Sequence, residues 1–198
     1  MKKAIIFFLS ILIFSTPVWA AGFLDKKVVK VGEAVPDFQL KDTSGQEHRL
    51  SGYQGKIVML HFWSATCPFV IRYDERLKQI ANDYSNHGVV VLGIDSNSNE
   101  TLDQVKKVAA IRKINYPILI DPGNQVADQF GAITTPHVFI LDKEGKLVYE
   151  GAVDDQGWSE ENPVTKQYAR EALDAMLAGS AVPTPETKSV GCTVKRAF

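Results

Sequence analysis

Hydrophobic and polar positions follow two different periods along this chain of 198 residues. A nearly continuous apolar run at 56–63, bounded by small residues, is typical of a central strand covered on both faces. Apolar side chains then recur at three- and four-residue spacing over 70–84, which predicts a long helix ending before Gly88. A second apolar run at 89–94 predicts another buried strand.

The remaining pattern predicts an α/β fold. Alternation around a polar turn predicts a hairpin over 37–50, and a short edge-like strand is expected at 117–120. Further helices are expected at 102–114, 121–130 and 165–177, and an antiparallel strand pair at 137–141 and 147–150. Alternating strands and helices predict a mainly parallel sheet with helices on both faces, and the final hairpin makes that sheet mixed.

The N-terminus has the pattern of a secretory signal. Lys2 and Lys3 precede an apolar run at 4–14, which is followed by Pro17 and the small-residue site at 18–20. We therefore expect 1–20 to be removed, leaving no membrane span, and the mature protein to be periplasmic or secreted.

Three further parts are expected after the signal. Segment 21–35 has mixed charge and no period, so we expect it to lie along the surface. Residues 36–178 form a single domain, and 179–198 form an extended tail with two prolines. The formal net charge of −1 gives no basic surface, so nucleic acid is not an expected partner.

Cys67 is the first candidate for chemistry. It follows the predicted central strand by a short turn and precedes Pro68, a residue preferred in the first turn of a helix. Unpaired backbone N–H groups and the positive end of the helix dipole stabilise a thiolate at that position. We therefore expect a reactive sulfur rather than an inert core cysteine.

A second candidate element is the segment Thr135-Pro136, immediately before a predicted buried strand. A proline there donates no hydrogen bond to a sheet and is compatible with either peptide isomer. Together with Trp63, Thr66, Cys67 and Pro68, it resembles the active-site turn and the threonine–cis-proline pair of the thioredoxin-fold superfamily. This resemblance implies a thioredoxin-like fold, and it makes Trp63, Thr66, Pro68, Thr135 and Pro136 expected residues of a substrate groove.

The Cys-Pro-Phe-Val turn, the segment 151–155 and the tail segment 190–196 resemble more narrowly the peroxiredoxin-like branch of the redoxins, labelled alkyl hydroperoxide reductase/thiol-specific antioxidant. The resemblance implies thiol–disulfide or peroxide chemistry. Val70 stands where a dithiol oxidoreductase has its second cysteine, so no vicinal disulfide forms. Leu60 and Ser64 stand where a peroxiredoxin has proline and threonine.

Cys192 leaves three alternatives open. It resolves a sulfenic acid or mixed disulfide at Cys67, it forms a permanent structural disulfide with Cys67, or an external thiol resolves Cys67 instead. In an exported protein the cysteines meet an oxidising compartment, which is compatible with each alternative.

Other polar residues are expected to have structural rather than catalytic roles. Asp95 ends the second buried strand, where it begins a polar loop more often than it orients a thiol. Arg72 and Arg76 are expected to be solvated on the helix that follows Cys67. His61 and His137 are expected to be hydrogen-bonded core or edge residues.

The prediction is an exported thiol oxidoreductase that uses the Cys67 thiolate in disulfide exchange or peroxide reduction, with Cys192 as the candidate resolving thiol, and that requires no metal or organic cofactor. Its expected partner is a thiol or disulfide protein, or a peroxide with an external thiol reductant. The alternative is a non-catalytic thioredoxin-fold binding module with a static Cys67–Cys192 disulfide.

Overall fold

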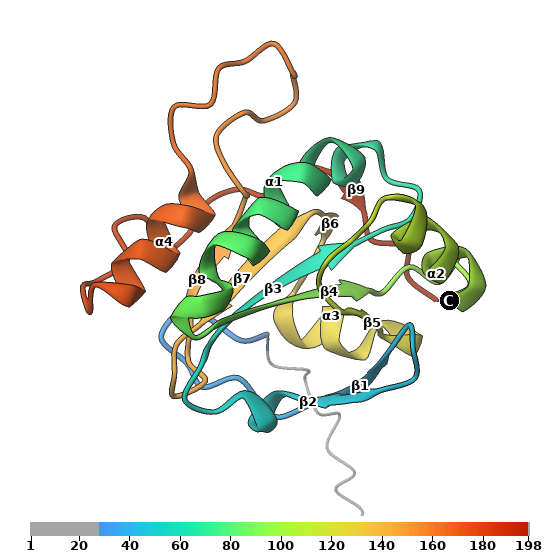
Figure 1. Cartoon of the computed structure of the whole chain (residues 1–198), viewed down its shortest axis with the longest axis horizontal. Coiled ribbons are helices and arrows are strands. Elements are labelled where there is room, and N and C mark those ends of the chain that lie inside the picture. Colours follow the sequence, from blue (N-terminus) through green and yellow to red (C-terminus); the bar gives the residue numbers. More distant parts are fainter. Residues whose placement is uncertain (1–27, 198) are drawn as a thin grey trace, which may run out of the picture.

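A seven-stranded mixed sheet forms the centre of the molecule (Figure 1). The structure is a computed structural model that describes residues 28–197, so the expected signal at 1–20 lies outside the described residues. The strand order is β2-β1-β5-β4-β3-β7-β8. The strands are β1 (Gln39–Asp42), β2 (Glu47–Arg49), β3 (Ile57–Trp63), β4 (Val89–Asp95), β5 (Ile118–Ile120), β7 (His137–Leu141) and β8 (Leu147–Gly151).

Strand β3 occupies the middle of the sheet, which explains its uninterrupted apolar sequence. It pairs in parallel with β4 and antiparallel with β7, and all seven of its side chains are buried. Strands β3, β4 and β5 are parallel, so their carboxyl ends meet at one edge. In α/β sheets this edge is where binding and catalytic residues gather.

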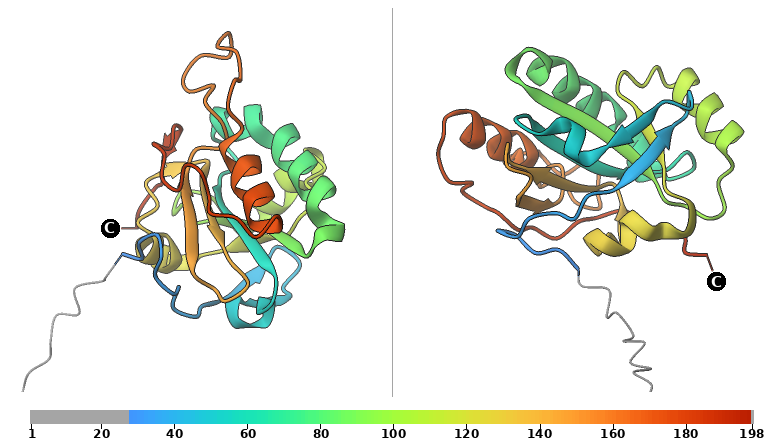
Figure 2. Two further views of the ribbon diagram at one scale, coloured as in Figure 1. Left: turned by 90° about the vertical axis from the view of Figure 1, so that its left-hand side faces the viewer. Right: turned by 90° about the horizontal axis from the view of Figure 1, so that it is seen from below.

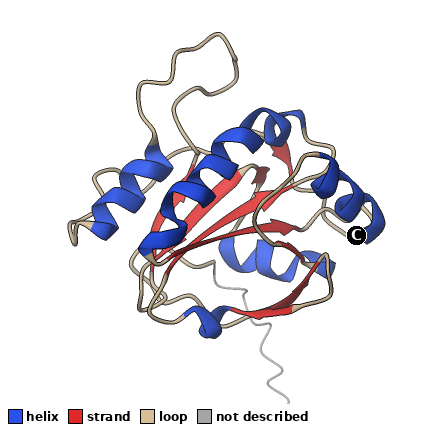
Figure 3. Ribbon diagram, in the orientation of Figure 1, coloured by secondary structure: helices blue, strands red, loops and turns tan. Residues whose placement is uncertain are grey.

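Helices cover both faces of the sheet (Figure 3). Helices α1 (Pro68–Tyr84), α2 (Leu102–Ile111) and α4 (Tyr168–Leu177) pack on one apolar cluster, and α3 (Gln125–Phe130) packs on the other. The mixed α/β sheet with helices on both faces is therefore confirmed. The sheet is not mainly parallel as expected, because only the β3–β4 and β4–β5 pairs are parallel, whereas the β1–β2 hairpin and β7 add antiparallel pairs. Within the described residues, no helix has both the length and the apolar character needed to cross a membrane.

Three expectations about individual segments require correction. Strand β5 is interior rather than an edge strand, because the β1–β2 hairpin adds to its outer side. Helices α2 and α4 are shorter than expected, spanning Leu102–Ile111 and Tyr168–Leu177. The described part of segment 21–35 is not confined to the surface, because Val29 is buried in the α3-side core and donates a backbone hydrogen bond to Gln129.

The C-terminal tail folds back onto the domain (Figure 2). The Thr187 N–H donates to the Glu150 carbonyl at 2.9 Å, so the tail first runs beside β8. It then forms β9 (Cys192–Thr193), which pairs antiparallel with β6 (Thr134–Thr135) in a small second sheet. The tail therefore brings a cysteine from the end of the chain to the carboxyl edge of β3.

Candidate active site

Cys67 lies at the junction between β3 and α1. It is the N-cap residue of α1, with Pro68 at the first helical position, as the sequence predicts. Its side chain is only 2% exposed, and the thiol donates a hydrogen bond to the Thr135 carbonyl at 3.0 Å. The helix N-terminus thus places the sulfur against β6.

Cys192 completes a pair of thiols. Its Sγ lies 2.6 Å from Cys67 Sγ, closer than a van der Waals contact, and both residues are free cysteines. Burial, followed by the contact with Cys67, raises the pKa of the Cys192 thiol to about 11. Cys192 therefore keeps its proton in the dithiol form at neutral pH.

The tail approaches β6 so closely that a side chain does not fit beside it. A Cβ built on Gly191 would lie 2.1 Å from the Thr135 carbonyl oxygen, and real Cβ atoms do not come that near. The obstacle is backbone rather than a flexible side chain. A glycine directly before Cys192 therefore permits the contact between the two sulfurs.

The expected groove residues divide into two groups. Thr135 and Pro136 are buried and joined by a cis peptide bond, and Thr135 pairs with Cys192 of the tail. Thr66 and Pro68 are exposed beside Cys67. Trp63 is completely buried on the α1 side of the sheet, so the structure places it in the core rather than on a groove surface.

A carboxylate that the sequence did not single out holds the loop before Cys67. Glu100 accepts hydrogen bonds from the Ala65 N–H at 2.7 Å and the Thr66 N–H at 2.9 Å. It also accepts from the Ser64 hydroxyl at 2.6 Å and from the Thr66 hydroxyl at 2.5 Å. The Ser64 oxygen in turn accepts from the Cys67 N–H at 3.1 Å. Glu100 therefore positions the backbone that leads into Cys67.

Asp95 lies behind this carboxylate at the end of β4. Its Oδ1 accepts from the Asn97 N–H at 2.8 Å, which confirms its role in the polar loop. Burial, together with the negative charge of Glu100, raises the pKa of Asp95 to about 8. Hydrogen bonds from Ser64 and Thr66 lower the pKa of Glu100. The pair therefore keeps one proton, on Asp95, at neutral pH.

Four other residues differ from expectation. Arg76 is not simply solvated, because it pairs at 2.8 Å with the buried Asp154, and Arg72 donates to the carbonyls of Gly157 and Trp158. Neither histidine has the expected full set of hydrogen bonds. Both ring nitrogens of His61 and Nδ1 of His137 are buried without a hydrogen-bond partner among the described residues. Burial lowers their pKa values to about 3 and about 4, so both are neutral.

Sequence reasoning missed Glu100, Asn97 and Asn124. All three follow carboxyl ends of parallel strands, in the polar loop after β4 or the turn after β5. Their position directly after the strand ends is the one feature of the sequence that indicates them, because polar loop residues show no hydrophobic periodicity.

Comparisons with known proteins identify the relatives of this chain. The model of the AhpC/TSA family matches residues 31–150, which include Cys67 and Pro136 but not Cys192. The thiol-disulfide oxidoreductase ResA of Geobacillus thermodenitrificans is 34% identical over 145 residues, covering 73% of this chain and 82% of that protein.

Two solved structures extend the likeness. An uncharacterized conserved protein of Geobacillus kaustophilus has a TM-score of 0.80 and 33% identity over 86% of this chain and 94% of that chain. An exposed lipoprotein thioredoxin of Streptococcus pneumoniae has a TM-score of 0.54 and 30% identity over 58% of this chain and 87% of that chain. The fold is therefore thioredoxin-like, as the sequence resemblance implied. The chain belongs to the AhpC/TSA family and is an oxidoreductase.

Proposed function

We propose that this protein is an exported thiol–disulfide oxidoreductase whose working dithiol consists of Cys67 and Cys192. The observation that carries the proposal is the 2.6 Å contact between the two sulfurs, made by residues 125 positions apart. Val70 stands where a vicinal second cysteine would be, and the tail supplies one from a distance. The name of the Geobacillus relative, a thiol-disulfide oxidoreductase, supports this class of reaction.

The reaction begins with the Cys67 thiolate. It attacks one sulfur of a partner protein's disulfide, forming a mixed disulfide and releasing the other partner sulfur as a thiolate. Cys192, once deprotonated, attacks Cys67 Sγ, so a Cys67–Cys192 disulfide forms and the second partner sulfur leaves. The partner gains two electrons and two protons, and an external dithiol reductant returns the protein to its reduced form.

Export is part of the proposal and depends on the pattern at 1–20. A secreted or periplasmic location supplies the oxidised protein disulfides on which such a dithiol acts. Fractionation of cells that express the whole chain, with intact-mass measurement of the product, tests it. A mature mass that lacks residues 1–20 is expected, and a cytoplasmic protein of full mass would contradict export.

Kinetic measurement with both cysteine variants tests the dithiol. Reduced wild type, Cys67→Ser and Cys192→Ser are mixed with a disulfide substrate and quenched by alkylation at intervals, and intact mass reports each product. Wild type should form the internal disulfide while the substrate is reduced. Cys192→Ser should stop at the mixed disulfide, and Cys67→Ser should not react. Circular dichroism of each variant checks that it is folded.

A static structural disulfide predicts a different result. Closing a loop of this length stabilises a fold by about 4–5 kcal/mol, so both serine variants would then lower stability equally. Neither would change a reaction, because wild type itself would be inert toward the substrate. That outcome would favour a non-catalytic binding module.

Peroxide reduction is a second candidate, favoured by the AhpC/TSA match. The Cys67 thiolate would attack a peroxide oxygen, the O–O bond would break, and the alkoxide would leave and take up a proton. Cys192 would then displace water from the sulfenic acid. A parallel experiment with peroxide measures this step, and oxidation of Cys67 no faster than that of free cysteine would exclude it.

A further inference from the structure

The chain's own C-terminus occupies the edge of β6. We call residues 189–197 the strap. Its strand β9 pairs Thr193 with Thr134 and Cys192 with Thr135, and the Val194 N–H donates to the Ile133 carbonyl at 3.1 Å. The edge of a strand pairs with one other strand at a time. While β9 is paired with β6, the strap therefore covers Cys67 and no other segment can pair there.

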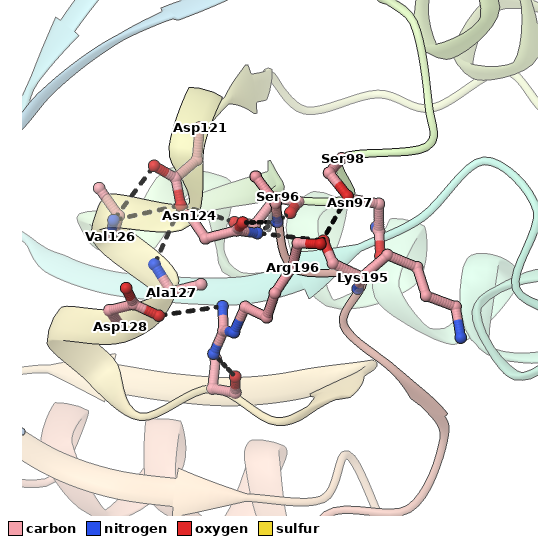
Figure 4. Close-up of polar contacts among 12 residues, drawn as sticks. Ser96, Asn97, Ser98, Asp121, Asn124, Val126, Ala127, Asp128, Lys195 and Arg196 are labelled. Carbon is pink, nitrogen blue, oxygen red and sulfur yellow. Dashed lines mark hydrogen bonds and ion pairs between the residues drawn. The ribbon is translucent and has the colours of Figure 1, made fainter.

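Two asparagine side chains form hydrogen bonds with the backbone at the end of the strap (Figure 4). Asn97 Oδ1 accepts from the Lys195 N–H at 3.1 Å, and Asn124 Nδ2 donates to the Lys195 carbonyl at 3.2 Å. Asn124 Oδ1 accepts from the Ala197 N–H at 2.9 Å. Asn97 and Asn124 are themselves buried, so they form a built receptor for an extended backbone rather than a chance surface contact.

One side chain of the strap is also recognised. The Arg196 guanidinium lies 3.4 Å from the Asp128 carboxylate and donates to the Ala132 carbonyl at 2.7 Å. Lys195, its neighbour, is exposed, and its side chain points away from these residues in Figure 4. The surface therefore contacts the side chain of Arg196, four residues after the cysteine, and not that of Lys195, three residues after it.

The pattern of the strap is a template for what this surface accepts. Gly191 passes the Thr135 carbonyl where a Cβ does not fit, and Val194 is 3% exposed within the α3-side core. A matching segment is extended and has glycine directly before its cysteine. It also has a small apolar residue two positions after the cysteine and arginine four positions after it.

We propose that the strap is a stand-in for a partner and that the same surface docks such a cysteine-bearing segment of a partner protein. The surface, which we call the docking edge, consists of the β6 backbone with Asn97, Asn124 and Asp128. This proposal rests on the proposed function, because the docked partner sulfur is the one joined to Cys67 in the mixed disulfide. When the strap returns, Cys192 attacks Cys67 Sγ and β9 takes the place of the departing segment, so product release and disulfide formation are coupled.

Peptide probes test the preference of the docking edge. The full chain with Cys192→Ser is mixed with the nonapeptide of sequence 189–197, whose cysteine is activated as a mixed disulfide with thionitrobenzoate. Cys67 attacks the peptide sulfur and thionitrobenzoate leaves, so its absorbance reports the rate. A peptide with glutamate in place of the arginine should react about fivefold more slowly, because its charge opposes Asp128. With Asp128→Asn the two rates should become equal, and with Asp128→Lys the order should reverse.

Loosening the strap should have the opposite effect. Arg196→Ala, made in the same Cys192→Ser chain, removes the contact with Asp128 and should speed the reaction with the parent peptide about fivefold. Lys188→Ala is the matched control: it removes the same positive charge at an exposed residue just before the strap and should leave the rate unchanged.

The outcomes separate this inference from the proposed function. Equal rates for all peptides, with Arg196→Ala no faster than Lys188→Ala, would overturn the docking edge while leaving Cys67 an exchange nucleophile. Absence of reaction with any activated peptide would overturn the proposed function itself. If Cys192 of the Cys67→Ser chain is activated as the same mixed disulfide with thionitrobenzoate, attack by Cys67 of the Cys192→Ser chain joins the two copies and releases thionitrobenzoate. Joining as fast as the peptide reacts would identify a second copy as the occupant, and would overturn a heterologous partner.

Discussion

Glu100→Gln isolates the contribution of the carboxylate that holds the loop before Cys67. Oε1 accepts three of its hydrogen bonds, from the Ser64 hydroxyl and from both the N–H and the hydroxyl of Thr66, and Oε2 accepts one from the Ala65 N–H. A glutamine that keeps its oxygen at the Oε1 position turns its NH₂ group toward the Ala65 N–H, so two donors face each other.

The magnitude follows from that geometry. One orphaned backbone N–H costs about 1–3 kcal/mol, and loss of charge assistance in the remaining bonds adds roughly 1 kcal/mol. Glu100→Gln should therefore lower the free energy of unfolding by about 2–4 kcal/mol. Because the Cys67 N–H is held by Ser64 within the same network, the rate of attack by Cys67 should also fall.

Guanidinium denaturation at neutral pH measures the stability, and the activated-peptide reaction measures the rate. Glu144→Gln, an exposed glutamate in the β7–β8 turn, is the matched control and should stay within about 0.5 kcal/mol of wild type. A Glu100→Gln protein as stable as this control would refute the reasoning. A pH–rate profile distinguishes a positioning effect from general instability, because it should change for Glu100→Gln and not for Glu144→Gln.

Two further predictions concern the tail and the buried acid. Gly191→Ala should slow formation of the Cys67–Cys192 disulfide roughly tenfold to a hundredfold, measured by quenched alkylation, because the new methyl group meets the Thr135 backbone. Gly52→Ala, where a Cβ meets nothing within 4 Å, is its control, and equal rates would contradict the close approach. Asp95 has a folded-state pKa raised above the ordinary 3.8, so the folded state binds the extra proton and stability falls as the pH rises from about 4 to about 8. Asp95→Asn keeps the acceptor for the Asn97 N–H without a proton to lose, so its denaturation midpoint should fall less over that range, and parallel pH profiles would show the prediction to be wrong.

The sequence by itself determined the layers of the fold and the position of Cys67 at a helix N-terminus. The run at 56–63 is nearly continuous in apolar side chains because β3 is flanked by β4 and β7 and covered on both faces. Cys67 beside Pro68 marks a helix N-terminus through local backbone chemistry alone. Such features involve neighbours in the chain, so periodicity and capping preferences report them.

Only the tertiary structure decided what surrounds Cys67. Cys192 reaches it across 125 residues of chain, and no local pattern encodes where an extended tail with two prolines will pair. Glu100 and Asn124 are polar residues in turns, and they acquire their contacts because parallel strands end at the same edge of the sheet. The chemistry of the single cysteine is local, whereas the second thiol and the strap that delivers it arise from contacts between distant segments.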